Sequence, residues 1–220
     1  MSRRGRSLTI RLLKQASGAL DLMIDSSGLM VSGEGKVRQH GVSKRRACPL
    51  REIHLAVDAG QQEIQAAVLT DAGGEDAEMV APLLAQIDNE IQSVNADGAC
   101  DKRKVYTLLA EQAPTAQVNT LRAPRRTAKV WQHGNSAEPA LARDTNLRRV
   151  REIGRKAWKR ETGYHRRSLA ETAMFRVKTL FGEHLSNRRY DTQATQLGLR
   201  CRALNRLTHL GMPQNYAVPA

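Results

Sequence analysis

Five short runs of apolar and β-branched residues, interrupted by two stretches with helical periodicity, place the tightest limit on what this chain can fold into. The strand-like runs lie at residues 20–25, 53–57, 64–69, 91–96 and 117–121. Apolar residues at helical spacing, at Met79–Ile87 and at residues 101–112, separate the last three runs. The predicted order is β-β-β-α-β-α-β, which is typical of a central sheet covered by helices.

Turn and loop signals divide these elements. The first run stops at Ser26-Ser27-Gly28, which predicts that Asp25 lies near the end of a strand. Residues 58–62 predict a hairpin loop between the second and third runs. Residues 31–50 and 122–143 have no period and contain many Arg and Lys residues, so both are expected to be exposed basic loops. Two helices are predicted after the second loop, ending at about residue 186.

The charge of the chain is large and uneven. It contains 35 Lys and Arg against 22 Asp and Glu, a formal net charge of +13. Residues 1–50 hold 10 basic and 3 acidic groups, residues 51–100 hold 1 and 10, and residues 101–220 hold 24 and 9. Two basic segments therefore flank an acidic block, and this balance favours a polyanionic partner.

Other function classes are disfavoured by composition. No apolar run approaches the roughly 18 residues of a membrane span, and no apolar region follows the basic start as in a signal peptide, so an intracellular protein is expected. The three cysteines are far apart, which argues against a disulfide framework and a zinc site. The six histidines show no metal-ligand spacing.

Three acids on separate elements are candidates for a metal site. Asp25 ends the first predicted strand, Asp97 ends the fourth, and Glu171 lies on a late helix. If the two strands are neighbours, both aspartates lie at one edge of the sheet. Carboxylates are the ligands that Mg²⁺ prefers, and two ions about 3.5–4 Å apart can drive a displacement at phosphorus. Taken singly, each aspartate is more typical of a turn cap.

The helix around Glu171 has two predicted faces. One stripe contains Tyr164, Arg167, Glu171, Met174 and Lys178, and the opposite stripe contains Leu169, Ala173, Val177 and Leu180. Two structural readings compete with a catalytic one. Ser168 and Glu171 have capping-box spacing, and Arg167 and Glu171 could form an ordinary i,i+4 ion pair on a solvated face.

The spacing Tyr164-x2-Arg167-x3-Glu171-x6-Lys178 resembles the C-terminal signature of bacterial insertion-sequence transposases with a DDE catalytic centre. The wider segment 154–174 resembles the insertion-sequence family numbered five in that group. Segments similar to the same family follow in the same order at residues 25–29, 33–35, 40–46, 54–58 and 96–99. The resemblance spans about residues 20–217.

This resemblance implies a ribonuclease H-like three-layer α/β domain, with a mixed five-stranded sheet flanked by helices, a basic irregular insertion and C-terminal helices. Asp25, Asp97 and Glu171 would be the catalytic and metal-binding triad, holding two Mg²⁺ or Mn²⁺ ions. The implied activity is metal-dependent DNA cleavage and strand transfer at terminal inverted repeats. The expected partners are double-stranded terminal-repeat and target DNA and a second copy of the chain in a synaptic homodimer, at the nucleoid in the bacterial cytoplasm.

Candidate DNA contacts come from two sources. By the resemblance, Arg167 and Lys178 would contact the backbone at the cut end, with Tyr164 nearby. Basic residues of the loops and of the late helical region can neutralise phosphates. They are Lys44, Arg45, Arg46, Arg125, Arg126 and Arg166. Trp131 could stack on a displaced base or anchor the insertion to the core.

The chain also departs from the family pattern. Only 24 residues precede Asp25, where full-length members carry a further helical region, so an N-terminal truncation is expected. Cys100 stands where an aromatic residue is usual.

We expect a basic, poorly ordered remnant at 1–18, the catalytic domain at 19–210 with its insertion at about 122–145, and a tail at 211–220. A nuclease of the same fold that cuts without strand transfer, and a non-catalytic DNA-binding remnant, are the alternatives.

Overall fold

The computed structural model describes residues 8, 10–12, 14, 17–31, 50–119, 129–132 and 141–211. Its strands are β1 (Leu20–Val31), β2 (Leu50–Asp58), β3 (Ile64–Asp71), β4 (Ile91–Ala96), β5 (Gln117–Asn119) and β6 (His184–Leu185). Its α-helices are α1 (Asp76–Leu84), α2 (Arg103–Gln112), α3 (Ala142–Ile153), α4 (Arg155–Glu161), α5 (Ser168–Phe181) and α6 (Tyr190–His209). Two short 3₁₀ helices, η2 (Gly98–Cys100) and η3 (Tyr164–Arg167), join them.

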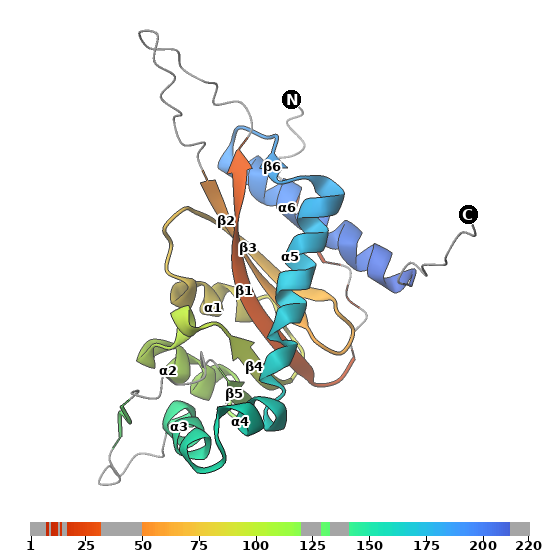
Figure 1. Ribbon diagram of the computed structural model, residues 1–220. Helices are drawn as coiled ribbons and strands as arrows, with labels where there is room; N and C mark the ends of the chain where they lie inside the picture. Colours follow the sequence, from red (N-terminus) through yellow and green to blue (C-terminus); the bar gives the residue numbers. More distant parts are fainter. Residues whose placement is uncertain are drawn as a thin grey trace, which may run out of the picture.

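The strands form one mixed sheet with the order β3-β2-β1-β4-β5 (Figure 1). β1, β2 and β3 are antiparallel neighbours, whereas β4 is parallel to β1 and β5 is parallel to β4. The short strand β6 pairs with the far end of β1. The predicted five-stranded mixed sheet flanked by helices, a ribonuclease H-like architecture, is confirmed.

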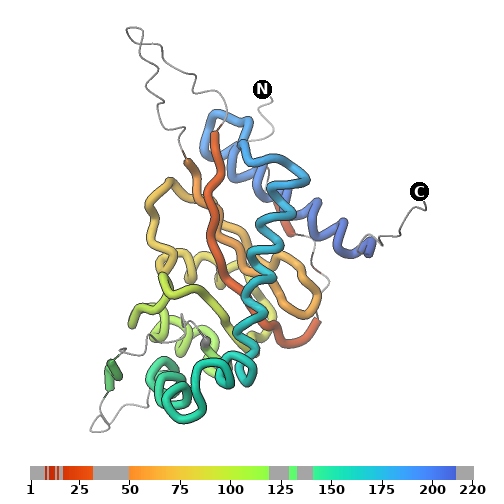
Figure 2. Tube along the Cα trace, in the orientation of Figure 1, coloured from red at the N-terminus to blue at the C-terminus, as the bar shows by residue number. Residues whose placement is uncertain are grey.

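Helices cover both faces of the sheet because the side chains of β1 alternate between two apolar cores. Leu22 and Ile24 lie in a core with α1 and α2, and Met23 lies in the core on the other face with α5 and α6. In Figure 2 the trace of α5 runs along the length of β1 from one end of the sheet to the other. A third small cluster, built on Trp158 and Tyr164, joins α4 to η3.

The first strand is longer than predicted. β1 continues through Ser26–Gly28 to Val31, so Asp25 lies inside the strand and not at its end. The cause is tertiary pairing: β2 continues opposite this stretch as far as the pair of Met30 with Leu50, and β6 pairs with Met30 and Val31. Ladder hydrogen bonds on both sides outweigh the local turn preference of Ser and Gly.

The outer edge of β3 is capped by side chains. Asn205 of α6 accepts from the Ile64 N–H at 2.8 Å and donates to the Ile64 carbonyl at 2.9 Å. Gln86 makes the same pair of bonds to Ala67, both at 3.3 Å, and Tyr190 donates to the Leu69 carbonyl. Unpaired edge groups invite pairing with another chain, so these caps close the edge against it.

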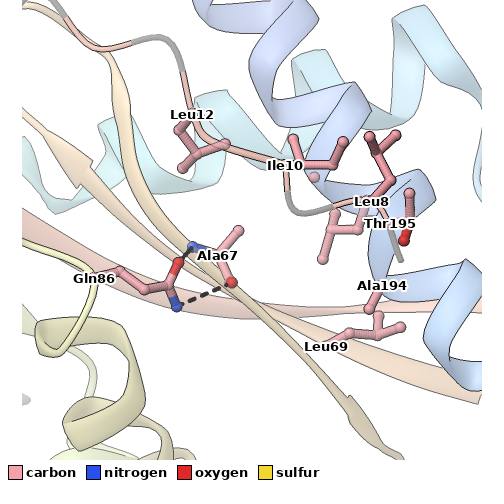
Figure 3. Close-up of a pocket in the computed structure, with 10 residues that line it drawn as sticks. Leu8, Ile10, Leu12, Ala67, Leu69, Gln86, Ala194 and Thr195 are labelled. Atoms are coloured by element: carbon pink, nitrogen blue, oxygen red, sulfur yellow. Dashed lines mark hydrogen bonds between the residues drawn. The ribbon is translucent and has the colours of Figure 1, made fainter. Parts of the chain in front are cut away.

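The described residues of the N-terminal segment pack beside this edge (Figure 3). Leu8, Ile10 and Leu12 line a pocket of about 230 Å³ between β3 and α6. Ile10 sits against Gly198, where an added Cβ would lie 3.0 Å from the Ile10 Cβ. Because Gly198 has no side chain, the middle of α6 leaves room for Ile10. The sequence predicted no helix or strand for this N-terminal segment. No helix among the described residues is long and apolar enough to cross a membrane.

Candidate active site

Asp25 and Asp97 meet because of the parallel pairing of β1 and β4. Ile24 and Ala96 are register partners, so the residues that follow them lie side by side. Asp25 faces the α5 side of the sheet by strand alternation. Asp97 comes directly after β4, where its carboxylate accepts a hydrogen bond from the Ala99 N–H at the start of η2. The turn-cap role considered for Asp97 is thus present, whereas Asp25 lies inside a paired strand.

Glu171, on α5, is linked to Asp25 by ion pairs that both residues make with Arg167. One guanidinium nitrogen of Arg167 lies 3.4 Å from an Asp25 oxygen, and the other donates to Glu171 at 2.5 Å. The Asp25 and Arg167 side chains are 16% and 23% exposed, against 54% for Glu171. The i,i+4 ion pair predicted as one alternative is therefore present. The capping box is not, because Arg167 precedes the helix as its N-cap and no side chain caps it.

The three acids repel one another. Burial raises the pKa of Asp25, and the charges of Glu171 and Asp97 raise it further, while Arg167 opposes them. A partly buried carboxylate beside two others has an excess of negative charge that one guanidinium only partly balances. The site therefore favours an added cation.

This donor set fits a hard divalent ion. Carboxylate oxygens suit Mg²⁺ and Mn²⁺, and few such ligands suffice when substrate phosphate supplies the rest. Across the described ranges, no three acidic, histidine or cysteine side chains already converge as a metal site. Arg167 lies between the Asp25 and Glu171 carboxylates, so these two acids would have to exchange their guanidinium contacts for an ion.

A second layer behind Asp25 was not predicted. His54, which is 2% exposed, is the cross-strand partner of Ser26. Its Nδ1 lies 3.3 Å from Asp76 Oδ1, and its Nε2 lies 3.0 Å from the Thr70 hydroxyl. The nearby His54 and Ser26 side chains lower the pKa of Asp76 against the effect of burial. The His54–Asp76 contact could have been predicted only from the cross-strand register of His54 with Ser26. The residues near His54 in the sequence do not determine that register.

These groups surround a cavity of about 10 Å³, roughly the room that one water needs. It is lined by Ile24, Asp25, Ser26, His54, Asp76, Asp97 and Cys100. Burial raises the pKa of the Cys100 thiol to about 12, and the neighbouring carboxylates raise it further. Cys100 is thus a neutral thiol packed in the core beside α1 and α2, in the place where an aromatic residue was expected.

The residues that were predicted to contact DNA lie in different parts of the structure. Lys178 lies beside the site and donates to the Ser27 hydroxyl of β1 at 2.7 Å. Arg166 instead forms an ion pair with Asp21 at 3.0 Å, near the start of β1. Tyr164 is 9% exposed because its ring packs on Trp158, with centroids 5.6 Å apart. The remaining predicted loop contacts, Lys44, Arg45, Arg46, Arg125 and Arg126, lie outside the described residues.

Trp131 occupies the anchoring position that was one of its two predicted roles. The Arg143 guanidinium lies 3.9 Å from the centre of its ring, and Tyr106 meets it edge-on at 5.9 Å. Its backbone N–H donates to the buried Asp144 carboxylate. These contacts bind residues 129–132 to α2 and α3, and they occupy the indole ring.

A family model described as "Transposase DDE domain" matches residues 16–206. A solved structure described as a "piggyBac transposase synaptic complex with hairpin DNA" is similar at 11% identity and a TM-score of 0.48, over 90% of this chain. The match spans 50% of that structure's chain. From its sequence match over most of its length, the chain belongs to the transposase DDE domain family, whose members catalyse phosphoryl transfer on DNA.

Proposed function

We propose that this chain is the catalytic domain of an insertion-sequence transposase, which cuts DNA at terminal inverted repeats and joins the freed 3′ ends to target DNA. Asp25, Asp97 and Glu171 would hold the divalent ions that this family's chemistry requires. The observation that supports this assignment most strongly is the β1–β4 register, which brings Asp25 beside Asp97, with Glu171 linked to Asp25 through Arg167.

The residues around the acids have separable tasks in this proposal. Bound divalent ions would lower the pKa of an attacking water and stabilise the leaving oxygen at phosphorus. Arg167, once released from Asp25, is placed to bind a phosphate through its planar fork of donors. Lys178, tethered to Ser27 beside the site, would hold the adjacent phosphate as a point charge.

The position of Lys178 and Arg167 on one helix matters for DNA alignment. Arg167 precedes α5 and Lys178 lies three turns along it, on the same side as Glu171. Two cations on either side of an acid can fix a phosphate backbone along the helix while the acid stays free for metal. Such contacts position DNA without reading its sequence.

The test is cleavage of a duplex that carries the inverted repeats bordering the gene, with Mg²⁺ or Mn²⁺. Asp97→Asn should abolish cutting. The matched control Asp88→Asn changes an exposed aspartate before β4, at the opposite end of that strand, and should cut like the wild type. Equal cleavage by Asp97→Asn and the wild type would remove Asp97 from the site.

Strand transfer separates the two alternatives. Joining of the labelled 3′ end to a supercoiled plasmid is the expected result for a transposase. Cleavage without joining would support a nuclease of the same fold. DNA binding without cleavage by the wild type would support a non-catalytic remnant, and both outcomes would contradict the proposal.

A further inference from the structure

The pair formed by His54 and Asp76 lies behind the acids of the candidate site. Asp25 points toward α5, whereas Ser26 and His54 point toward α1, because alternate residues of a strand face opposite sides of the sheet. Asp76 is the first residue of α1, and its Oδ1 lies 3.3 Å from the Nδ1 of His54. The pair therefore lies across β1 from the side chain of Asp25.

One small cavity is shared by this pair and by two of the three acids. Its lining includes Asp25, Asp97, His54 and Asp76. Its volume of about 10 Å³ is close to the room that one water needs. Burial raises the pKa of the Cys100 thiol in its wall to about 12, and the charges of the three aspartates raise it further. The three carboxylates therefore act on the same space.

One oxygen of Asp76 is buried without a hydrogen-bond donor. Among the residues that the structure describes, none donates to its Oδ1 with good geometry, although His54 Nδ1 lies near it. The His54 side chain, and more weakly that of Ser26, lower the pKa of Asp76 against the effect of burial. A buried, ionised oxygen is costly to leave without a donor. The cavity that Asp76 lines is the place where a donor fits.

A divalent ion held by Asp25 and Asp97 would supply this donor. Mg²⁺ keeps several waters when only one or two carboxylates bind it. Side chains that accept hydrogen bonds around a metal site typically change its metal affinity 10- to 100-fold. Asp76 lies across β1 from Asp25 and beside His54, so it is placed to reach a water of the ion and not the ion itself.

The surroundings of His54 fix its ring beside Asp76. The side chain is 2% exposed, and its Nε2 lies 3.0 Å from the hydroxyl of Thr70 on β3. The contact at Nε2 holds the ring in one orientation, in which Nδ1 faces the Asp76 carboxylate. His54 thus holds Asp76 as the outer partners of metal ligands hold those ligands.

We propose that the His54–Asp76 pair sets the affinity of the Asp25–Asp97 site for its divalent ion. Asp76 Oδ1 accepts a hydrogen bond from a water that the ion retains, and His54 holds Asp76 in place. Both are positioning residues, because neither touches the reacting atoms. The inference rests on the proposed function, since it takes Asp25 and Asp97 as metal ligands.

The test measures Mn²⁺ affinity, so it needs no turnover. Protein bound to an uncleavable terminal-repeat duplex is titrated with Mn²⁺, and the free ion is followed by its paramagnetic resonance signal. Asp76→Asn keeps the shape of the side chain and should raise the Mn²⁺ dissociation constant about 10- to 100-fold, with the same number of ions at saturation. The matched control Glu78→Gln removes an exposed carboxylate of α1 that is paired with Lys104, and it should bind Mn²⁺ like the wild type.

Two substitutions of His54 separate positioning from a purely structural role. Asn carries an amide donor in place of Nδ1, so His54→Asn should keep most of the wild-type Mn²⁺ affinity, whereas His54→Leu should lose as much as Asp76→Asn. In the Asp76→Asn background His54→Leu should add little, because His54 acts through Asp76. Urea unfolding in EDTA shows which variants are folded, and Asp76→Asn alone decides the test if His54→Leu is not.

Three results would overturn the inference. Asp76→Asn could bind Mn²⁺ as tightly as the wild type, or Glu78→Gln could lose as much affinity as Asp76→Asn. Exchange into D₂O, followed by pulsed paramagnetic resonance, could show one more water on the ion in Asp76→Asn, which would make Asp76 a direct ligand. If the wild type takes up no Mn²⁺, or if Asp97→Asn takes up as much as the wild type, the proposed function fails as well.

Discussion

Replacing Arg167 with Met tests how the acids of the site are held. The substitution keeps most of the volume of the side chain and removes its charge. Two unit charges about 4 Å apart attract by roughly 4 kcal/mol at an effective dielectric constant of 20. Breaking a fully buried pair costs about 3–5 kcal/mol and an exposed pair about 0–1. Because Asp25 and Arg167 remain 16% and 23% exposed, we expect a loss of about 2 kcal/mol in the free energy of unfolding.

The loss of unfolding free energy caused by Arg167→Met should increase with pH. Burial already raises the pKa of Asp25 above its ordinary value, and removing Arg167 raises it further. A carboxyl with a raised folded-state pKa gives its full stabilisation below the unfolded pKa of about 4, and that stabilisation is lost as pH rises through the folded value. Arg167→Met should therefore cost little near pH 4 and most at neutral pH.

The assay is urea unfolding in EDTA at both pH values, within a double-mutant cycle. Asp25→Asn removes the charge that Arg167 compensates, so Arg167→Met should cost little in that background beyond its exposed contact with Glu171. At neutral pH, a loss of about 2 kcal/mol corresponds to a melting temperature roughly 4–8 °C lower. An equal loss with and without Asp25→Asn would show that Arg167 does not act through Asp25.

Three further tests probe the fold and the DNA surface. Gly198→Ala in a helix should normally stabilise by about 0.5–1 kcal/mol, but the Ile10 contact at 3.0 Å should cancel this gain in urea unfolding, and Ile10→Gly should restore it. Asn205→Ala leaves both backbone groups of Ile64 without their side-chain partner and should cost about 2–4 kcal/mol, so an unchanged urea midpoint would contradict the edge cap. Lys178→Ala should reduce the slope of log affinity against log salt by about 1 in DNA anisotropy titrations, and an unchanged slope would rule out a phosphate contact.

Much of the sheet was predictable because its signals are local. The run 91–96 became β4 with the predicted bounds, and the hairpin at 58–62 joins β2 to β3. The predicted end of β1 was wrong because it relied on a local turn preference. Ser26-Ser27-Gly28 favours a turn in isolation, but β2 and β6 supply ladder partners from elsewhere in the chain.

The predicted faces of α5 were also partly wrong. The predicted apolar stripe of α5 included Leu180, which is 52% exposed, and the predicted polar stripe included Met174, which is buried. The buried face of α5 is the i, i+3, i+4, i+7 set Ala170, Ala173, Met174 and Val177, so the core-facing side is rotated from the predicted stripe toward Met174 and away from Leu180. Spacing correctly grouped Arg167 with Glu171, because these two are four residues apart.

The contacts of the site depend on pairings that spacing cannot supply. The sequence indicates that Asp25 and Asp97 share a sheet edge if two strands are neighbours, and the β1–β4 register makes them so. The His54–Asp76 contact required knowing that Ser26 faces His54. The partner of Arg166 was also out of reach, because Asp21 lies 145 positions away in the sequence.

Metal binding by the three acids is the claim on which the account depends. The direct measurement is Mn²⁺ binding, followed by the loss of the free-ion paramagnetic resonance signal, with protein bound to an uncleavable terminal-repeat duplex. The wild type and Asp88→Asn should take up the same amount of Mn²⁺, up to two ions per chain, while Asp25→Asn, Asp97→Asn and Glu171→Gln should each take up less. Equal uptake by the three site variants and the wild type would contradict the account.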